Sequence, residues 1–365
     1  MVHVLALVTD AFGGRGGIAR YNRDLLAALA ASAAVDRITV LPRLAPDELS
    51  MLPHNVEQRT AIFNPIGYSI AALRACGTLR KGSLLFCGHL GMSPLVAAIA
   101  RLARSPMWLQ VHGIEAWTTP SWSVRWAAQQ ATLITSVSRY TKARMSSWWN
   151  GEPSRIRILS NTFGAQFTPG PRPVDLIRRY GLAGRKVILT VSRLVRTERY
   201  KGNEQLIAAL PEIRRQHADA AYLIVGDGDD IGRLRSLAAQ HGVSDHVVFA
   251  GHVSDAELPH HFRLADVYVM PSTQEGFGIV FLEAAASGLP VIGGHRDGSV
   301  DALADGRIGR AIDPNSREEI VAAVIDAFEG RIIPSPAEVQ RFSSRNFAAH
   351  VDELVRNFAK PIVAS

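Results

Sequence analysis

The sequence predicts an α/β protein built on two doubly wound parallel sheets. Three observations support this class: short apolar runs alternate with longer amphipathic stretches, the runs of the second half are nearly continuous in Val, Ile and Leu, and a proline-rich segment separates two halves of similar length. Continuous apolar runs are typical of strands buried on both faces, as in parallel sheets covered by helices. A chain of 365 residues is long enough for two domains with full cores.

In the first half, the pattern predicts strands and helices in alternation. The expected strands lie near 2–9, 37–42, 57–63, 83–88, 107–112, 133–137 and 155–160, and the expected helices near 17–31, 67–79, 93–103 and 138–148. The uncharged stretch 82–100 is about long enough to span a membrane, but Gly88, Gly91 and Pro94 interrupt it. A strand followed by a helix is therefore the preferred interpretation.

The second half repeats the pattern. Strands are expected at 186–192, 221–226, 246–251, 267–272 and 290–294, with helices at 204–216 and 231–241 among them. Three prolines within Phe167–Pro173 predict the linker, which gives an N-terminal domain over 1–168 and a C-terminal domain over 169–344. A last segment, roughly 335–360, is helical in pattern and has no strand of its own.

Cysteine content and the N-terminus exclude several classes. The two cysteines, Cys76 and Cys87, have neither metal-ligand spacing nor a Cys/His cluster around them. A disulfide scaffold and a structural zinc site are therefore not expected. The first apolar run has no basic segment before it and no small-residue cleavage site, which favours a cytoplasmic protein.

Positive charge is concentrated in the first half. Residues 1–170 contain 17 Lys and Arg against 8 Asp and Glu, whereas residues 171–365 contain 23 against 25. Such a surplus attracts nucleic acid, anionic lipid or a phosphate-bearing acceptor. All six tryptophans lie in the same half among basic residues, which suits a bilayer headgroup region, although core packing is the expected fate of at least half of them. We expect peripheral contact with an anionic membrane.

Two strand-to-helix loops have the composition of phosphate sites. The first runs from Asp10 to Ala19 with four glycines, which let a backbone approach an anion at a helix start. A dinucleotide site is one alternative and a tight turn without ligand is another, but the second strand ends in Pro42 and Arg43 without the acidic residue that a dinucleotide site requires. The second loop carries Arg193 and Lys201, two cations that can converge on one diphosphate; a solvated surface is the alternative.

The most informative segment is Glu275–Glu283, after the strand at 267–272. If a helix begins near Gly278, Glu275 lies in the loop above its N-terminus and Glu283 lies about one and a half turns inside. The free N–H groups between them face an anion. Two carboxylates that bind vicinal hydroxyls beside a phosphate-binding helix end describe a sugar-nucleotide site, with Glu283 on the ribose and Glu275 on the sugar.

Taken together, these motifs resemble glycosyltransferase family 4, retaining enzymes of the GT-B fold. The resemblance rests on the E-x7-E segment, Arg193 with Lys201, the glycine-rich first loop, and two short motifs at 226–228 and 251–253. It implies two Rossmann-like domains facing an interdomain cleft, and a C-terminal crossing helix, about 345–365, that packs on the first domain. Hinge closure would then bring donor to acceptor.

The resemblance also implies roles for individual residues. Arg193 and Lys201 would stabilise the departing diphosphate without a metal or other cofactor, and His112, after the strand at 107–112, would face the sugar. A strand-end histidine taken alone is more often structural, and no nucleophile is assigned. The remaining donor-binding residues implied are Gly16, Gly17, Gly226, Val253, Phe277, Gly278, Ile279, Val280 and Glu283.

The amino-acid sequence as a whole resembles those of bacterial mannosyltransferases of exopolysaccharide and lipopolysaccharide synthesis. This implies transfer of mannose from GDP-mannose to a glycan or lipid-linked acceptor, at the inner face of the cell membrane. A UDP-hexose donor is one alternative, and a UDP-sugar epimerase of the same fold is another. A nucleic-acid-binding protein would rest on the pI of about 9.7 alone, since no nucleic-acid module is recognisable.

Overall fold

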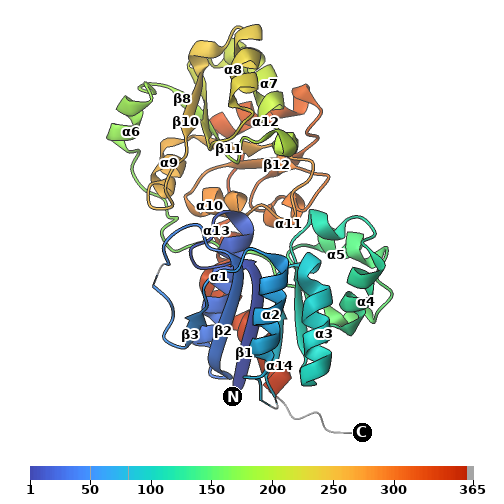
Figure 1. The fold of residues 1–365 in the computed structure, drawn as a ribbon. Helices are drawn as coiled ribbons and strands as arrows, with labels where there is room; N and C mark the ends of the chain where they lie inside the picture. Colours follow the sequence, from blue (N-terminus) through green and yellow to red (C-terminus); the bar gives the residue numbers. More distant parts are fainter. Residues whose placement is uncertain (50, 81, 360–365) are drawn as a thin grey trace. The chain divides into compact units, whose positions relative to one another are not determined.

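The computed structural model describes residues 1–49, 51–80 and 82–359 (Figure 1). The chain forms two compact units, each with its own parallel sheet. Unit 1 comprises 1–162 and the C-terminal segment from Ser344, and unit 2 comprises Phe163–Ser343. The predicted fold class is confirmed.

Unit 1 contains a seven-stranded sheet in the order β3-β2-β1-β4-β5-β6-β7. All pairings are parallel, as the buried apolar strands predict. The strands are β1 (Val2–Asp10), β2 (Val35–Leu44), β3 (Val56–Gln58), β4 (Leu84–Cys87), β5 (Met107–Val111), β6 (Leu133–Ser136) and β7 (Ile156–Ile158). Strand β3 is shorter than the expected 57–63, because the chain soon reaches the Asn64-Pro65 start of the next helix.

The helices of unit 1 cover this sheet. They are α1 (Gly16–Ala31), α2 (Pro65–Cys76), α3 (Ser93–Ala103), α4 (Trp122–Gln130), α5 (Arg139–Ser146) and α14 (Ser344–Ala359). Short 3-10 turns lie at Leu90–Met92, Ile114–Ala116 and Pro153–Arg155. Helix α4 is absent from the sequence-based expectation, because only its small residues Ala127 and Ala128 are fully buried and its apolar periodicity is weak. The stretch 82–100 forms β4 and the first part of α3, as predicted.

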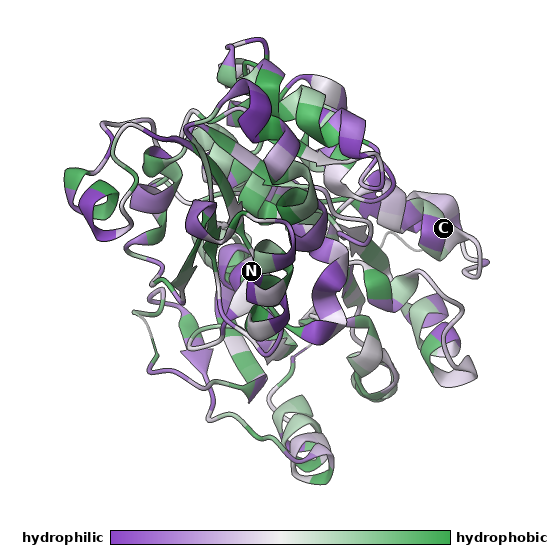
Figure 2. Cartoon of the chain, turned by 90° about the horizontal axis from the view of Figure 1, so that it is seen from above, coloured by the Kyte–Doolittle hydropathy of each residue, from purple (hydrophilic) through white to green (hydrophobic). Residues whose placement is uncertain are grey.

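Unit 2 contains a six-stranded parallel sheet in the order β10-β9-β8-β11-β12-β13. Its strands are β8 (Lys186–Val191), β9 (Ala220–Val225), β10 (Val247–Gly251), β11 (Val267–Met270), β12 (Val291–Gly294) and β13 (Arg310–Ile312). Its helices are α6 (Val174–Arg179), α7 (Asn203–Gln216), α8 (Ile231–Gln240), α9 (Leu258–Leu264), α10 (Ile279–Ala286), α11 (Ser299–Ala302), α12 (Arg317–Phe328) and α13 (Pro336–Arg341), with 3-10 turns at Arg196–Lys201, Ser244–His246 and Ala304–Gly306. Figure 2 shows hydrophobic residues along the strands, where the core of each unit lies.

The C-terminal helical segment is divided between the units. Helix α13 packs on α10 in unit 2, whereas α14 packs on α1 in unit 1. The ring of Phe347 contacts Tyr21 at 5.9 Å, and Ser32 donates a hydrogen bond to Asp352 at 2.6 Å. Residues 360–365, which the sequence analysis includes in the crossing helix, lie outside the described residues. The proline-rich segment is packed at its start, since Phe167 is buried against Phe262 of unit 2.

Two expectations about the membrane can be compared with the structure. Within the described ranges, no helix combines the length and apolar character needed to cross a bilayer. Four tryptophans, at 108, 117, 148 and 149, are buried in the core of unit 1, while Trp122 and Trp126 are exposed on α4. Most of the tryptophans therefore pack in the core of unit 1.

Candidate functional site

The carboxyl ends of two neighbouring strands in unit 2 bring Lys201 and Glu275 together. Strands β8 and β11 are adjacent and parallel, so the loops that follow them leave from the same edge of the sheet. The Nζ of Lys201 forms an ion pair with the Glu275 carboxylate, and only 16% and 11% of the two side chains is exposed. Burial disfavours the charged form of Lys201, but the Glu275 carboxylate outweighs it and the pKa of Lys201 is raised. Lys201 therefore keeps its charge in a sheltered site.

A buried carboxylate fixes the loop that carries Glu275. Asp297, after β12, accepts hydrogen bonds on Oδ2 from the Glu275 backbone N–H (2.6 Å) and the Ser272 hydroxyl (2.9 Å). Its Oδ1 accepts from the backbone N–H of Ser299 at 2.9 Å, and the Gly298 N–H donates to the Glu275 carbonyl at 2.8 Å. Burial raises the pKa of Asp297 to about 6. Sequence reasoning missed Asp297, although an acidic residue just beyond the strand at 290–294 was a usable signal.

Helix α10 begins where the sequence predicts. Gly278 is its N-cap and Ile279 its first residue. Glu275 lies in the loop before the cap, and Glu283 lies in the second turn, almost fully buried. The expected arrangement of two carboxylates on either side of a helix start is confirmed. Because the first N–H groups of a helix have no partner within it, this end can bind an anion.

The side chains between the two carboxylates mainly serve the core. Phe277 is buried with its ring 5.9 Å from that of Phe342, and Ile279 is buried as well. Val280 is half-buried. The donor contacts of all three residues stay predictions.

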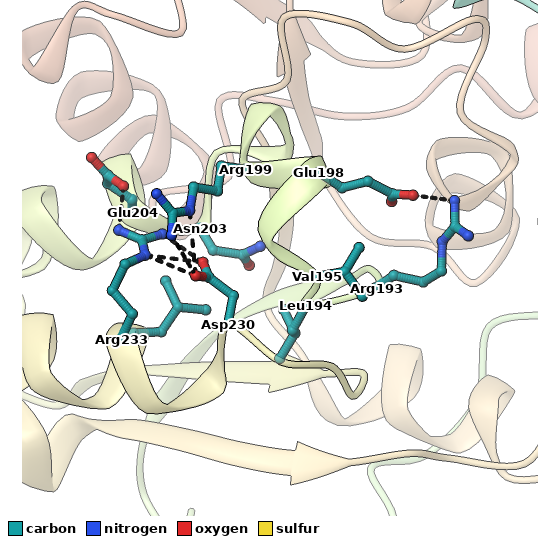
Figure 3. Close-up of a pocket in the computed structure, with 10 residues that line it drawn as sticks. Arg193, Leu194, Val195, Glu198, Arg199, Asn203, Glu204, Asp230 and Arg233 are labelled. Atoms are coloured by element: carbon teal, nitrogen blue, oxygen red, sulfur yellow. Dashed lines mark hydrogen bonds and ion pairs between the residues drawn. The ribbon is translucent and has the colours of Figure 1, made fainter.

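Arg193 has different surroundings from Lys201, although both follow β8. Its side chain is 71% exposed, and its guanidinium forms an ion pair with Glu198 (Figure 3). The structure thus joins Lys201 to Glu275 and Arg193 to Glu198. The convergence of Arg193 and Lys201 on one diphosphate stays a prediction.

A charged network beside a small pocket holds the segment that leads to Lys201. The 3-10 turn Arg196–Lys201 is tied to α8 through Arg199, whose Nη2 donates to the buried Asp230 at 3.0 Å. Arg233 donates to Asp230 at 2.7 Å and to Glu204 at 2.6 Å (Figure 3). These hydrogen bonds lower the pKa of Asp230, with Arg233 making the largest contribution. The position of Lys201 therefore depends on contacts with α7 and α8.

Close backbone approach joins the two short glycine motifs of unit 2. The Gly226 N–H donates to the Gly251 carbonyl at 2.9 Å, which places the loop at 226–228 beside the loop containing Val253. A Cβ on Gly226 would lie 1.8 Å from the Ser192 carbonyl oxygen, and its φ of +141° is one that other residues rarely adopt. Glycine is therefore required at 226 by packing. The ligand contacts of Gly226 and Val253 stay predictions.

The glycine-rich loop of unit 1 is more open. Gly16 and Gly17 are exposed, and a Cβ on either would meet no atom within 4 Å. Arg15, the N-cap of α1, makes no side-chain cap hydrogen bond and pairs with the partly exposed Asp47 at 2.6 Å. The first N–H groups of α1 thus lie beside accessible space. Phosphate binding by Gly16 and Gly17 stays a prediction.

His112 directly follows β5, as the sequence predicts. Its Nε2 lies 2.9 Å from the Gly88 carbonyl oxygen, and since a carbonyl only accepts, Nε2 carries the proton. Burial lowers the pKa of His112, so the ring is neutral at pH 7 and Nδ1 holds a lone pair. The Glu115 carboxylate accepts a hydrogen bond from the His112 backbone N–H at 2.5 Å and so fixes the strand end.

Two further polar residues lie near His112 and were missed by the sequence analysis. The ring of His89 stacks on that of His112 at 6.4 Å, and Asp10 ends β1, which is separated from β5 by β4. Burial raises the pKa of Asp10. Strands β1, β4 and β5 are neighbours, so their carboxyl ends gather Asp10, His89 and His112. The signal for Asp10 and His89 was their position just beyond apolar runs.

Metal ligation has no evident site in the part of the chain that the structure describes. There, no group of three or more His, Cys, Asp or Glu side chains is arranged to hold a metal ion. Both cysteines are free thiols, and the buried Cys87 donates to the His89 carbonyl at 3.3 Å.

Solved structures and curated relatives resemble this chain over long stretches. Among solved structures, HepE of Anabaena in complex with UDP has a TM-score of 0.75 at 19% identity, over 98% of this chain and 100% of that one. Sucrose-phosphate synthase of Thermosynechococcus elongatus has a TM-score of 0.75 at 20% identity, over 97% and 98%. At such identities the likeness establishes the fold alone, which is that of GT-B glycosyltransferases.

Sequence relatives are closer but match in part. A GDP-mannose-dependent alpha-(1-6)-phosphatidylinositol monomannoside mannosyltransferase of Mycolicibacterium smegmatis is 37% identical over 56% of this chain and 55% of its own length. The protein of the same description from Mycobacterium tuberculosis is 36% identical over 64% and 63%. The chain thus spans less than two thirds of the length of these curated relatives.

Family models match both units. The model described as "Glycosyl transferases group 1" matches residues 176–345, and the model described as "Glycosyl transferase 4-like domain" matches residues 16–162. Together they span most of the chain, and their order is the one that the sequence motifs predict. The chain belongs to glycosyltransferase family 4.

Proposed function

We propose that this protein is a retaining mannosyltransferase that moves mannose from GDP-mannose to a lipid-linked or glycan acceptor of the cell envelope. The observation that carries the proposal is the start of α10, where Glu275 and Glu283 flank the first turn of the helix and Lys201 lies against Glu275. The mannosyltransferase relatives, described as GDP-mannose-dependent, favour this donor. A UDP-hexose is the second candidate, because a structural neighbour is solved with UDP-glucose and a relative at 30% identity is a glycogen synthase.

In this proposal the donor is held by unit 2. The diphosphate binds at the start of α10, Glu283 accepts hydrogen bonds from the ribose hydroxyls, and Glu275 accepts from the hydroxyls of the sugar. When the diphosphate takes the place of Glu275 as the partner of Lys201, the ammonium stabilises the negative charge that develops on the leaving group. Arg193, exposed on the same loop, leaves Glu198 to add a second cation. His112 presents its Nδ1 lone pair to a sugar hydroxyl.

Donor binding is the first test. Binding of GDP-mannose, UDP-glucose, UDP-N-acetylglucosamine and NAD(P) is measured calorimetrically in the presence of a chelator, for the parent and for Glu283→Gln. We expect GDP-mannose alone to bind, and the variant to bind it at least about tenfold more weakly, since a carboxylate accepting from two hydroxyls is worth about 1.5–3 kcal/mol. Glu318→Gln, at an exposed carboxylate on α12, is the matched control.

Each other outcome of this test has a defined meaning. Selective binding of a UDP-sugar, lost in Glu283→Gln, would keep the transferase proposal and replace its donor. Binding of NAD(P) alone would contradict the proposal and favour the glycine-rich first loop as a dinucleotide site.

The acceptor is proposed to be lipid-linked and presented at the inner face of the cell membrane. The charge surplus of residues 1–170 supports an acceptor or surface that carries phosphate. The test is transfer of radiolabelled mannose to an extracted lipid fraction compared with soluble oligosaccharides. Label in the oligosaccharides alone would contradict a lipid-linked acceptor.

A further inference from the structure

Three hydrogen-bonded polar side chains lie at the otherwise apolar core of unit 2. Thr190 on β8, Asn203 at the start of α7 and Tyr222 on β9 are buried, and Tyr222 is packed among the aliphatic side chains of that core. The Tyr222 hydroxyl donates to Oδ1 of Asn203 at 2.9 Å and also lies 2.9 Å from the Thr190 hydroxyl. Thr190 in turn donates to the Val269 carbonyl of β11 at 2.5 Å. We call Thr190, Asn203 and Tyr222 the buried polar cluster.

Stability of the core does not by itself explain these polar groups. A buried hydroxyl or amide loses its contacts with water, and the hydrogen bonds that it makes in the protein contribute only modestly beyond offsetting that loss. Apolar side chains of similar size at positions 203 and 222 would fill the same space without this cost. A fully paired polar group in a core does, however, fix the arrangement of its partners. The buried polar cluster is therefore suited to holding the elements that it joins in one position.

Asn203 connects the two segments that carry the proposed diphosphate-binding cations. Its Nδ2 donates to the Ser192 hydroxyl at 3.2 Å, and Ser192 directly precedes Arg193. In the sequence, only Gly202 separates Asn203 from Lys201. Asn203 also lines the small pocket together with Arg193 (Figure 3). One buried side chain thus joins the segment that carries Arg193 to the segment that carries Lys201.

Close packing also restricts the backbone on either side of Lys201. Gly202 has a φ of +84°, and a Cβ there would lie 2.5 Å from the Pro271 carbonyl oxygen. The Tyr200 carbonyl accepts a hydrogen bond from the Thr273 N–H at 3.0 Å. Pro271 and Thr273 belong to the loop that follows β11 and leads to α10. The residues before and after Lys201 are therefore held against that loop.

Resting on the proposed donor site, we propose that Asn203 and Tyr222 are positioning residues for diphosphate binding. Asn203 sets the distance between the backbone segments of Arg193 and Lys201, and the Tyr222 hydroxyl holds the Asn203 amide in the orientation that this contact requires. Both cations can then reach one diphosphate when it replaces their carboxylate partners. The two positioning residues act through the cations, so they affect affinity for the diphosphate and leave recognition of the base unchanged.

The test is calorimetric binding of GDP and GMP, and of UDP and UMP, to the full chain in the presence of a chelator. We expect the parent to bind one nucleoside diphosphate more tightly than the monophosphate of the same base. Tyr222→Phe and Asn203→Leu are each expected to bind that diphosphate at least about tenfold more weakly, the equivalent of one hydrogen bond to a charged group. Affinity for the monophosphate should change much less, because one phosphate does not bridge two cations on separate segments.

The double variant Tyr222→Phe/Asn203→Leu separates positioning from stability. It replaces both partners of the hydrogen bond with apolar groups of similar size, so the urea midpoint of unfolding should stay close to that of the parent. Its diphosphate affinity should nonetheless fall as in the single variants, and because both changes act through one contact, their effects should not add. Ile207→Val, at a buried residue of α7, is the matched control. It lowers stability through a small cavity and should leave diphosphate affinity unchanged.

Three results would overturn the positioning role and leave the proposed function in place. The first is diphosphate affinity in the double variant equal to that of the parent. The second is equal weakening of diphosphate and monophosphate binding, which would indicate a general loss of structure. The third is a loss of affinity in Ile207→Val as large as in the double variant. A parent that binds neither GDP nor UDP more tightly than the matching monophosphate would instead contradict the proposed donor site, and the positioning role with it.

Discussion

The loop before α10 and the loop before α1 occupy equivalent places at the carboxyl ends of two parallel sheets, yet they are built differently. The loop before α10 is crowded: Asp297 accepts from the Glu275 backbone, and Glu275 pairs with Lys201. The loop before α1 is open, with space around Gly16 and Gly17. The loop before α10 is therefore held by its neighbours, so the anion site proposed there would be preformed, whereas the site proposed in the first loop would adjust to its ligand.

The largest effect is expected where crowding is greatest. Gly226→Ala would place a Cβ 1.8 Å from the Ser192 carbonyl oxygen at a φ of +141°, so the loops after β8 and β9 cannot keep their positions. We expect a loss of more than about 4 kcal/mol in the free energy of unfolding, measured by urea denaturation. A loss below about 1 kcal/mol would show that the loops after β8 and β9 can move to accommodate the added Cβ. It would weaken the contrast between these crowded loops and the open loop of unit 1.

Removal of the buried cation is expected to affect turnover. Lys201→Ala should lower kcat by about 10²–10³, because the ammonium would no longer stabilise the leaving diphosphate. Arg196→Ala, at an exposed arginine of the same turn, is the control and should change kcat less than twofold. Initial rates of mannose transfer measure both, and circular dichroism checks the fold. Normal turnover in Lys201→Ala would contradict the electrostatic role.

A smaller effect is expected from substitution of Asp297, the carboxylate that fixes the loop before α10. In Asp297→Asn, the amide group would face a backbone N–H that now donates to a carboxylate oxygen, which costs about 1–3 kcal/mol. We expect the KM for GDP-mannose to rise by about 5- to 150-fold with kcat less affected. Glu318→Gln, at an exposed carboxylate on α12, is again the control and should keep the KM of the parent.

The pH dependence of this variant separates loop positioning from a general loss of structure. Because the pKa of Asp297 is raised to about 6, acidification through pH 6 protonates it, and the uncharged carboxyl becomes a weaker acceptor for the Glu275 N–H. Donor affinity of the parent should therefore fall as pH decreases through 6. The Asn variant should show only the residual dependence that comes from the diphosphate itself. Identical profiles for the two proteins would argue against the role of Asp297.

The smallest effect on stability is expected in the open loop. Gly17→Ala meets no neighbouring atom, so the free energy of unfolding should change by less than about 0.5 kcal/mol. If the backbone of this loop approaches the phosphates, the same variant should raise the KM for the donor. An unchanged KM would limit donor binding to unit 2.

Much of the fold followed from local pattern. The strand at 267–272, the start of α10 at Gly278 and the placement of His112 after β5 were all predicted, because apolar runs and helix-start residues act over a few positions. The short strand β13 and helix α4 were missed. Both bury few large side chains, so their stability comes from neighbours that the local sequence does not reveal.

The sequence predicted which residues belong to the candidate site better than it predicted which of them are in contact. The spacing of Glu275 and Glu283 was sufficient to place them around a helix start, but the pairing of Lys201 with Glu275 joins residues 74 positions apart. Asp297 was missed for the same reason, since it reaches Glu275 from the next strand of the sheet.

The sequence by itself determined the fold class, the E-x7-E segment and the excess of positive charge in residues 1–170, since these depend on composition and short-range periodicity. Only the tertiary structure decided which charges meet and which apolar residues stay outside the core. Four tryptophans became core residues, while Ile66, Ile70 and Leu73 remained exposed on α2. Burial depends on how helices pack on a sheet, and a helix that is apolar on both sides can cover that sheet with one side only.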